Sequence, residues 1–187
     1  MKEDQTINDI WSILLEAANS RSHAYHVLSL AYQSQQVECC SVVLQGIESA
    51  TVRFHAHHGS PKIAAIIKNP RVSLLGYDRL EKEQIRIKGT VVMHHGDEEA
   101  KRIWHTMKDS SKLCYQYPAP GIDRDGEPLS QERLRENLKA DPLVGLDAFV
   151  VCYVQIDMID LLRLQYKGHQ RFQYINQGGW LVKEVQA

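Results

Sequence analysis

The sequence predicts a mainly β, α+β fold in which about six to eight antiparallel strands form a barrel with flanking helices. Short runs of alternating or β-branched apolar residues recur along the chain, whereas only a few stretches have helical periodicity. The chain has 187 residues, of which 43% are hydrophobic, so we expect one packed domain over residues 1–187. A barrel is expected because closing the sheet removes its exposed edges, and helices would then lie at its mouth.

Alternation, β-branched residues and flanking turn formers mark the predicted strands. The strands are expected at residues 25–32, 38–47, 51–57, 72–77, 84–93, 149–156, 171–175 and 180–185. Residues 33–36 are expected to form the turn between the first two strands. The sequence 176–179, Asn-Gln-Gly-Gly, has a hairpin signature and should join the last two.

Helices are expected at residues 9–19, directly after Ser60, at 97–107 and at 130–139. Residues 118–128 are rich in turn formers and are expected to form a loop.

The helix after Ser60 is the most informative element of the chain. Ser60 is expected to cap it through its hydroxyl, and Pro61 suits the first helical position, where its missing N–H has little effect. Free N–H groups, the helix dipole and Lys62 together favour an anion such as a phosphate at this end. The alternative is a plain helix cap beside a solvated lysine.

The composition argues against several classes of protein. The net charge of −1 provides no long-range field for nucleic acid, although a local basic pocket remains compatible with it. No apolar run is long enough for a membrane span and no secretion signal begins the chain, so a cytoplasmic location is expected. The four cysteines, Cys39, Cys40, Cys114 and Cys152, form no C-x-x-C pair and are expected to be reduced thiols.

Nine histidines raise the alternative of a metal site. His55 and His57 would share one face of a strand, as a zinc pair requires. No carboxylate or cysteine lies at ligand spacing beside them, so we expect no metal. The sequence also lacks G-x-G-x-x-G, phosphate-loop and nucleophile-elbow motifs.

Several motifs resemble those of the pyridoxine (pyridoxamine) 5′-phosphate oxidase-like family of FMN-binding split barrels. They are Gly-Ser-Pro-Lys at 59–62, Asn-Pro-Arg-Val-Ser-Leu-Leu at 69–75, Glu-Gln-Ile-Arg-Ile-Lys-Gly at 83–89, and Lys-Gly-His-Gln-Arg-Phe at 167–172. Gln116 with Pro-Ala-Pro-Gly at 118–121 is similar to a subgroup of that family. The resemblance covers the chain from about residue 25 to its end.

The resemblance implies an FMN-dependent oxidoreductase that acts on a small, possibly pyridoxal-type molecule. It implies a homodimer with two flavin sites at the interface, and the composition leads us to expect that this dimer binds neither nucleic acid nor membrane. The implied cofactor-binding residues are Ser41, Val42 and Val43 beside the ring, Ser60 and Lys62 at the phosphate, His55, Gln84, and Gln116 and Arg171 from the partner subunit. Lys167 and His169 are the implied catalytic residues on the substrate side.

The chain also departs from the family pattern at basic positions. Cys40 and Pro61 replace arginines near the flavin, Gln45 replaces a basic residue that meets substrate phosphate, and Lys167 replaces an arginine. Each lost charge-assisted bond removes roughly 1.5–3 kcal/mol of binding free energy. These departures keep a second hypothesis open, namely a non-catalytic or stress-related split-barrel module with weakened flavin affinity.

Overall fold

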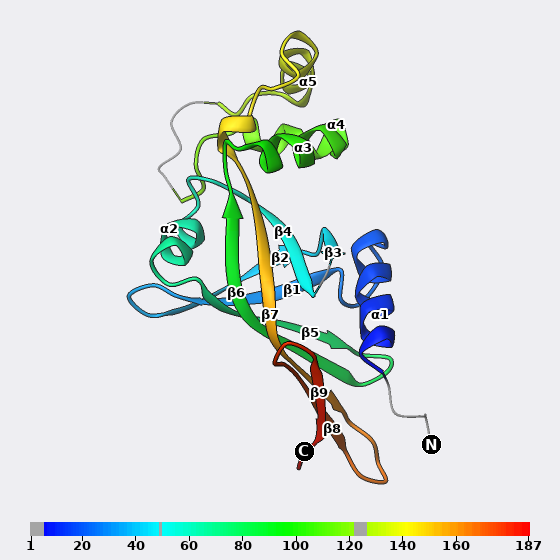
Figure 1. Ribbon diagram of the computed structural model, residues 1–187. Coiled ribbons are helices and arrows are strands. Elements are labelled where there is room, and N and C mark those ends of the chain that lie inside the picture. The colour runs from blue at the N-terminus through cyan, green and yellow to red at the C-terminus, as the bar shows by residue number, and fades with distance from the viewer. Residues whose placement is uncertain (1–5, 49, 122–126) are drawn as a thin grey trace.

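The computed structural model describes residues 6–48, 50–121 and 127–187, and it shows one antiparallel sheet with helices around it (Figure 1). The strands are β1 (Val27–Gln33), β2 (Val37–Val43), β3 (Gly46–Glu48), β4 (Thr51–His57), β5 (Arg71–Asp78), β6 (Glu83–His94), β7 (Phe149–Arg163), β8 (Gln170–Asn176) and β9 (Trp180–Glu184). The α-helices are α1 (Ile7–Asn19), α2 (Pro61–Lys68), α3 (Glu98–Thr106), α4 (Asp109–Lys112) and α5 (Gln131–Ala140). Two 3₁₀ turns, η1 (Leu113–Gln116) and η2 (Leu146–Ala148), complete the described elements.

The strands pair in the order β2-β1-β5-β6-β7-β4-β3, and the hairpin β8–β9 is attached to β7. Strand β7 is long because it pairs with β4 through its first half and with β8 through its second half. Beside it, β6 is interrupted by a register shift between Lys88 and Gly89. A Cβ at Gly89 would lie 2.2 Å from the carbonyl oxygen of Gln155, so only glycine permits this close approach.

The expected barrel is split rather than closed by strand pairing. The ends of the pairing path, β2 and β3, are consecutive in the chain and are joined by Leu44 and Gln45. Leu44 N–H donates to the carbonyl of His26 before β1, whereas Gln45 N–H donates to the carbonyl of Arg53 on β4. The chain therefore changes partner strands at this point, and the predicted single strand 38–47 is wrong there.

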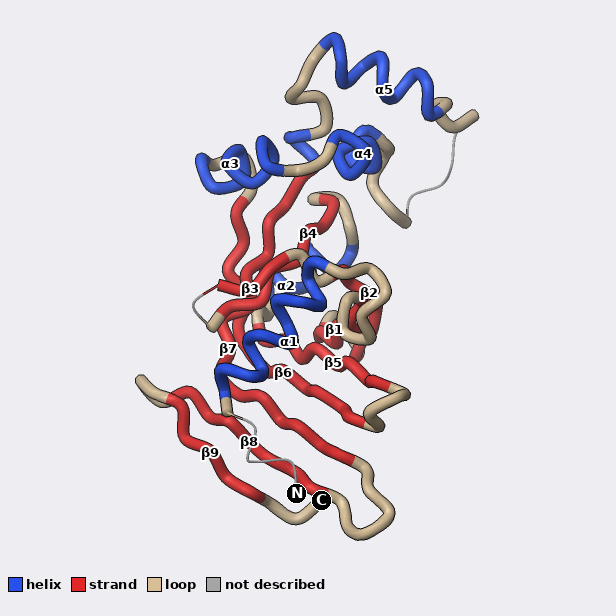
Figure 2. Tube along the Cα trace, turned by 90° about the vertical axis from the view of Figure 1, so that its right-hand side faces the viewer, coloured by secondary structure: helices blue, strands red, loops and turns tan. Residues whose placement is uncertain are grey.

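The main core lies inside the sheet and is covered on one side by α1 (Figure 2). Strand β4 shows the pattern that produces it: Val52, Phe54 and Ala56 are buried in the core, and the residues between them face outward. Helix α1 adds Ile10 and Leu14 to the same core. Thr6 and Asp9 form a capping box at its N-terminus.

Helices α3, α4 and α5 gather at one end of β6 and β7, away from the β8–β9 hairpin (Figure 1). A second cluster packs α3 and η1 against β7: the rings of Trp104 and Tyr115 pack edge-on against Phe149, with centroids 5.3 and 5.0 Å from it. The indole N–H of Trp104 donates to the carbonyl of Pro142 at 2.9 Å.

Most predicted elements are confirmed with small shifts at their ends, and the fold is the expected α+β split barrel. Besides the break in the predicted strand 38–47, three details differ from expectation. Strand β7 continues to Arg163, beyond the predicted residue 156. Helix α4 and the 3₁₀ turns were not expected, because they are too short to show a period. Ser60 is the N-cap residue of α2 but its hydroxyl makes no capping hydrogen bond. Part of the expected loop 118–128 lies outside the described residues.

Candidate functional site

A groove of about 720 Å³ opens between the end of α1, strands β2 and β4, and the segment from α3 to η1. Its size is in the usual range for a small-molecule or cofactor site. Its lining comprises Ala18, Asn19, Arg21, His26, Ser41, Val42, Val43, Gln45, Arg53, His55, Lys62, Ile103, Thr106, Met107, Lys108, Ser111, Cys114 and Tyr115.

The groove is electropositive although the whole chain has a net charge of −1. Arg21, Arg53, Lys62 and Lys108 line it, and its lining residues include no Asp or Glu. Cations gathered in a cleft raise the local concentration of anionic ligands. The arrangement therefore favours a ligand that carries negative charge.

Five of the sequence-predicted site residues meet in this groove. Ser41, Val42 and Val43 come from the end of β2, His55 from β4 and Lys62 from the first turn of α2. Lys62 lies near the Cys40 thiol: burial raises the pKa of that thiol, and the lysine charge acts in the opposite direction.

His55 is held as a neutral imidazole. Burial, with a smaller contribution from the charge of Arg53, lowers its pKa to about 3. Its ring is edge-on to Phe149 at 4.9 Å, and its Nε2 is buried with no hydrogen-bond partner. An unpartnered buried nitrogen is costly, and a bound ligand could supply the missing partner.

Ser60 is buried at the start of α2, two residues before Lys62. Its Oγ also has no hydrogen-bond partner. Pro61 has no backbone N–H, so the start of this helix offers one donor fewer to an anion. The polar side chains at this helix start are the Ser60 hydroxyl and the Lys62 ammonium group. Ser60 does not itself line the groove.

Sequence reasoning missed Arg21, Arg53 and Lys108. Arg53 lies on the same face of β4 as His55, so the alternation of this strand could have revealed it. Arg21 and Lys108 lie outside the body of any long helix or strand, so no periodicity marks them. They reach the groove only because the fold brings the end of α1 and the end of α3 together.

Gln84 and Arg171 lie elsewhere, on the outer face of the sheet. We define the outer face by one row of registered neighbours across six strands: Ser41, Ser29, Leu75, Arg86, Asp160 and Gln173. Gln84 and Arg171 belong to the next row, and both lie opposite Leu162. Ser41 is therefore on the same face as both, near its other end.

Arg171 has an ion-pair partner within the chain. Its guanidinium donates to both carboxylate oxygens of Asp160, with Nη2 at 2.9 Å, and Arg86 and Gln173 reach the same group at 3.3 and 3.1 Å. Burial alone would raise the pKa of Asp160, but the hydrogen bonds from Arg171 and Gln173 and the nearby positive charges hold it below its usual value. The carboxylate stays charged and fixes the direction of Arg171.

Lys167 and His169 lie in the exposed loop between β7 and β8, at the opposite end of the sheet from α3 and α4 (Figure 1). His169 Nδ1 accepts a hydrogen bond from the backbone N–H of Gln165 at 3.2 Å. One copy of the chain does not bring this loop to the groove.

Gln116 is occupied by a contact within the helical end. Its side-chain amide donates to the carbonyl of Leu134 at 3.0 Å and accepts from Asn137 at 3.2 Å. The amide thereby holds α5 against η1. A role for Gln116 at a flavin stays a prediction.

The histidines are engaged in other ways. The rings of His58 and His95 stack at 4.0 Å, and His94 pairs with Asp97 at 2.8 Å. Among the residues that the structure describes, no three His, Cys, Asp or Glu side chains are grouped to hold a metal ion. Within the same residues, no helix is long and apolar enough to cross a membrane.

Comparisons with known proteins agree with this architecture. The family model for pyridoxamine 5′-phosphate oxidase matches residues 33–126, half of the chain. A structure of a pyridoxamine 5′-phosphate oxidase-related, FMN-binding protein from Nostoc punctiforme superposes with a TM-score of 0.78 at 20% identity, covering 100% of both chains. PhzG from Burkholderia lata, solved with tetrahydrophenazine-1-carboxylic acid, gives a TM-score of 0.71 at 19% identity, covering 100% of this chain and 95% of its own.

A more distant structure, a FAD-binding protein from Mesorhizobium loti, has a TM-score of 0.51 at 14% identity and covers 83% of this chain and 93% of its own. No curated protein matches the chain in sequence. At these identities the solved structures show a shared fold, and the family model adds the sequence evidence. The chain belongs to the pyridoxamine 5′-phosphate oxidase family.

Proposed function

We propose that the protein binds FMN in the groove and acts, as a single-domain homodimer, as an oxidoreductase on a small molecule. The observation that carries the proposal is the groove itself. It joins Ser41, Val42, Val43, His55 and Lys62, five residues that the family resemblance assigns to the flavin, in a cleft lined by four cations and no acid.

The residues present fit a flavin phosphate. Lys62 at the start of α2 offers a charge beside the helix N-terminus, and Ser60 Oγ has an unused hydrogen-bonding position. The groove also holds Arg21 and Lys108, whose positive charge can compensate for the arginines that the family has at the positions of Cys40 and Pro61. These two residues favour the enzyme over the module with lost flavin affinity.

Two of the solved structures with this fold are described as binding a flavin, FMN in one and FAD in the other. This agrees with a flavin in the groove, and we propose FMN because Lys62 and the helix start offer one phosphate position.

A second copy of the chain is proposed to complete each site. The outer face exposes apolar side chains: Val27, Leu75 and Tyr77 are 50%, 41% and 44% exposed. Ser41 at one end of this face lines the groove, whereas Arg171 lies toward the other end. If two outer faces pack together in opposite directions, Arg171 of one copy approaches the groove of the other.

The proposed roles follow from chemistry at each position. A bound flavin supplies hydride and electron transfer. Lys62 would neutralise the phosphate, the backbone of Ser41–Val43 would support the ring, and His55 would offer its neutral Nε2 as a hydrogen-bonding group. Lys167 and His169 on the exposed loop, with Gln84 and Arg171 beside it, would contact substrate or ring from the second copy.

Flavin retention tests the proposal. Purified protein is mixed with FMN and desalted, and we expect it to keep the visible absorbance of the flavin. Lys62→Ala should weaken binding roughly 10- to 150-fold through loss of a charge-assisted bond. Lys68→Ala is the matched control, since Lys68 lies on the same helix but does not line the groove. A colourless protein without a thermal shift on adding FMN would favour the non-catalytic module instead.

The assembly has its own test. Leu75→Arg places a charge in the middle of the outer face and should convert the dimer to a monomer in sedimentation analysis. Leu80→Arg is the control, because Leu80 lies in the turn between β5 and β6 and is already exposed. A wild-type protein that sediments as a monomer contradicts the proposed site.

A further inference from the structure

We propose that Arg53 binds a carboxylate of the substrate, so that the substrate class is a small organic acid with an apolar body. The inference rests on the proposed function, since it places this acid in the groove assigned to the flavin. It concerns a residue that neither the motifs nor the family resemblance singled out.

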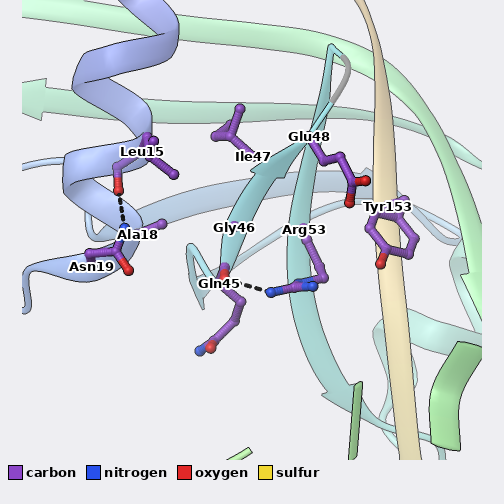
Figure 3. A pocket seen from close by; sticks show the side chains of 9 residues that line it. All are labelled: Leu15, Ala18, Asn19, Gln45, Gly46, Ile47, Glu48, Arg53 and Tyr153. Carbon is purple, nitrogen blue, oxygen red and sulfur yellow. Dashed lines mark hydrogen bonds between the residues drawn. The ribbon is translucent and has the colours of Figure 1, made fainter. Parts of the chain in front are cut away.

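The guanidinium of Arg53 is held in one orientation. Its Nη2 donates to the carbonyl of Gln45 at 2.9 Å, as Figure 3 shows. It also lies flat against Gly46, where a Cβ would be 3.0 Å from Nη2 and 3.3 Å from Cζ. A side chain fixed before the ligand arrives loses little further entropy on binding.

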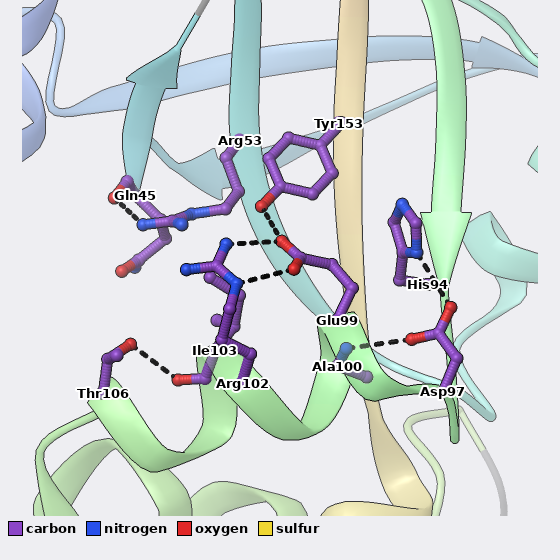
Figure 4. Close-up of polar contacts among 10 residues, drawn as sticks. All are labelled: Gln45, Arg53, His94, Asp97, Glu99, Ala100, Arg102, Ile103, Thr106 and Tyr153. Carbon is purple, nitrogen blue, oxygen red and sulfur yellow. Dashed lines mark hydrogen bonds and ion pairs between the residues drawn. The ribbon is translucent and has the colours of Figure 1, made fainter.

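The hydrogen-bonding capacity of this guanidinium is only partly used, at the carbonyl of Gln45 and toward the hydroxyl of Tyr153. An arginine has five N–H donors, and Nε of Arg53 is buried without a partner. No carboxylate forms an ion pair with Arg53 within the described ranges. The nearby acid Glu99 is taken by Arg102 and Tyr153, and the guanidinium of Arg53 points to Gln45 instead (Figure 4).

The position of Arg53 suits a ligand that enters from the groove. A smaller cavity of about 270 Å³ adjoins the groove, and Arg53 lines both. The smaller cavity is lined by Leu15 and Ile47 but also by the acid Glu48, whereas the groove has the apolar side chains of Ile103 and Met107 and no acid. An anion bound at Arg53 on the groove side therefore has Ile103 and Met107 in the lining around it, which favours a compact apolar body.

The charge balance favours a carboxylate over a phosphate ester. Lys62 and the start of α2 form the cationic set proposed for the flavin phosphate, and Arg53 lies on a different element. One fixed guanidinium compensates one negative charge, and its planar fork matches the two oxygens of a carboxylate. A phosphate dianion would leave a charge uncompensated at this position.

Calorimetric titration of the full-length, FMN-loaded protein with benzoate tests the inference, with phenyl phosphate as the competing probe. We expect wild type to bind benzoate more tightly than phenyl phosphate. Arg53→Met should weaken benzoate binding by at least about 10-fold. The benzoate affinity of Arg53→Lys should lie between those of wild type and Arg53→Met. Gly46→Ala keeps the charge but displaces the guanidinium, so it should also weaken binding. Arg102→Met is the control and should bind as wild type does.

Three results would overturn the inference: no benzoate binding by wild type, equal affinity in wild type and Arg53→Met, or tighter binding of phenyl phosphate. If Arg53→Met fails to fold, Gly46→Ala and Arg53→Lys decide the question in its place. Flavin absorbance after desalting is measured on the same samples. A protein that loses FMN yet still binds benzoate through Arg53 contradicts the proposed function and leaves the carboxylate site standing.

Discussion

His55 gives the structure a measurable dependence of stability on pH. The perturbation is His55→Gln, which keeps a polar side chain and removes the titrating group. In the folded protein burial lowers the pKa of His55 from 6.5 to about 3, whereas the unfolded chain has the ordinary value. The stability contributed by the neutral ring is therefore fully present above pH 6.5 and is lost as the pH falls toward 3.

The magnitude follows from the linkage between protonation and folding. At pH 5 the unfolded chain has taken up the proton and the folded protein has not. With a linkage of about 1.36 kcal/mol per pKa unit, wild type should lose about 2 kcal/mol between pH 7.5 and pH 5 through this residue. His55→Gln should lose about 2 kcal/mol less than wild type over the same interval.

Urea unfolding at pH 7.5 and pH 5, at one fixed protein concentration and without added flavin, measures this difference. His105→Gln is the matched control, because His105 is exposed in the last turn of α3. Equal losses of unfolding free energy in wild type and His55→Gln would refute the conclusion that the folded protein holds His55 neutral.

Two further predictions concern the sheet. Arg171→Ala should lower the free energy of unfolding by about 2 kcal/mol, because it leaves the buried carboxylate of Asp160 without its closest partner. The loss in urea unfolding should shrink in an Asp160→Asn background, and an unchanged loss would contradict the pairing. Gly89→Ala should cost about 3 kcal/mol, because the new Cβ would meet the carbonyl of Gln155, which is backbone. Gly179 has open space around it, so Gly179→Ala should leave the free energy of unfolding unchanged. Similar melting temperatures for Gly89→Ala and Gly179→Ala would contradict the close approach of Gly89 to Gln155.

The sequence predicted elements whose cause is local. Strand β4 matches its predicted residues 51–57 because its successive residues alternate between the core and the opposite face of the strand. The break between β2 and β3 was missed because it depends on which strands lie beside Leu44 and Gln45. Nothing in the local pattern of those two residues says that the hydrogen bonds pass from one neighbour to another.

The candidate site shows the same contrast between what a local sequence pattern predicts and what depends on contacts in the folded chain. Ser41–Val43 and Lys62, which the family resemblance assigned to one site, line the same groove in the structure. The additional cations of the groove could not be predicted, since Arg21 and Lys108 belong to segments that meet only in the folded chain. Ser60 occupies the expected N-cap position of α2, but its buried hydroxyl makes no hydrogen bond to the helix or to any other described group.

On strand β4, the residues that pack the core and the residues that line the groove lie on opposite faces. Its even-numbered residues, such as Phe54, belong to the interior, and Arg53 and His55 on the opposite face line the groove. Exchanging a cleft residue therefore leaves the interior side chains of the strand untouched. Ligand preference can change along this strand during evolution while the protein retains its ability to fold, which fits a scaffold shared by proteins only 20% identical.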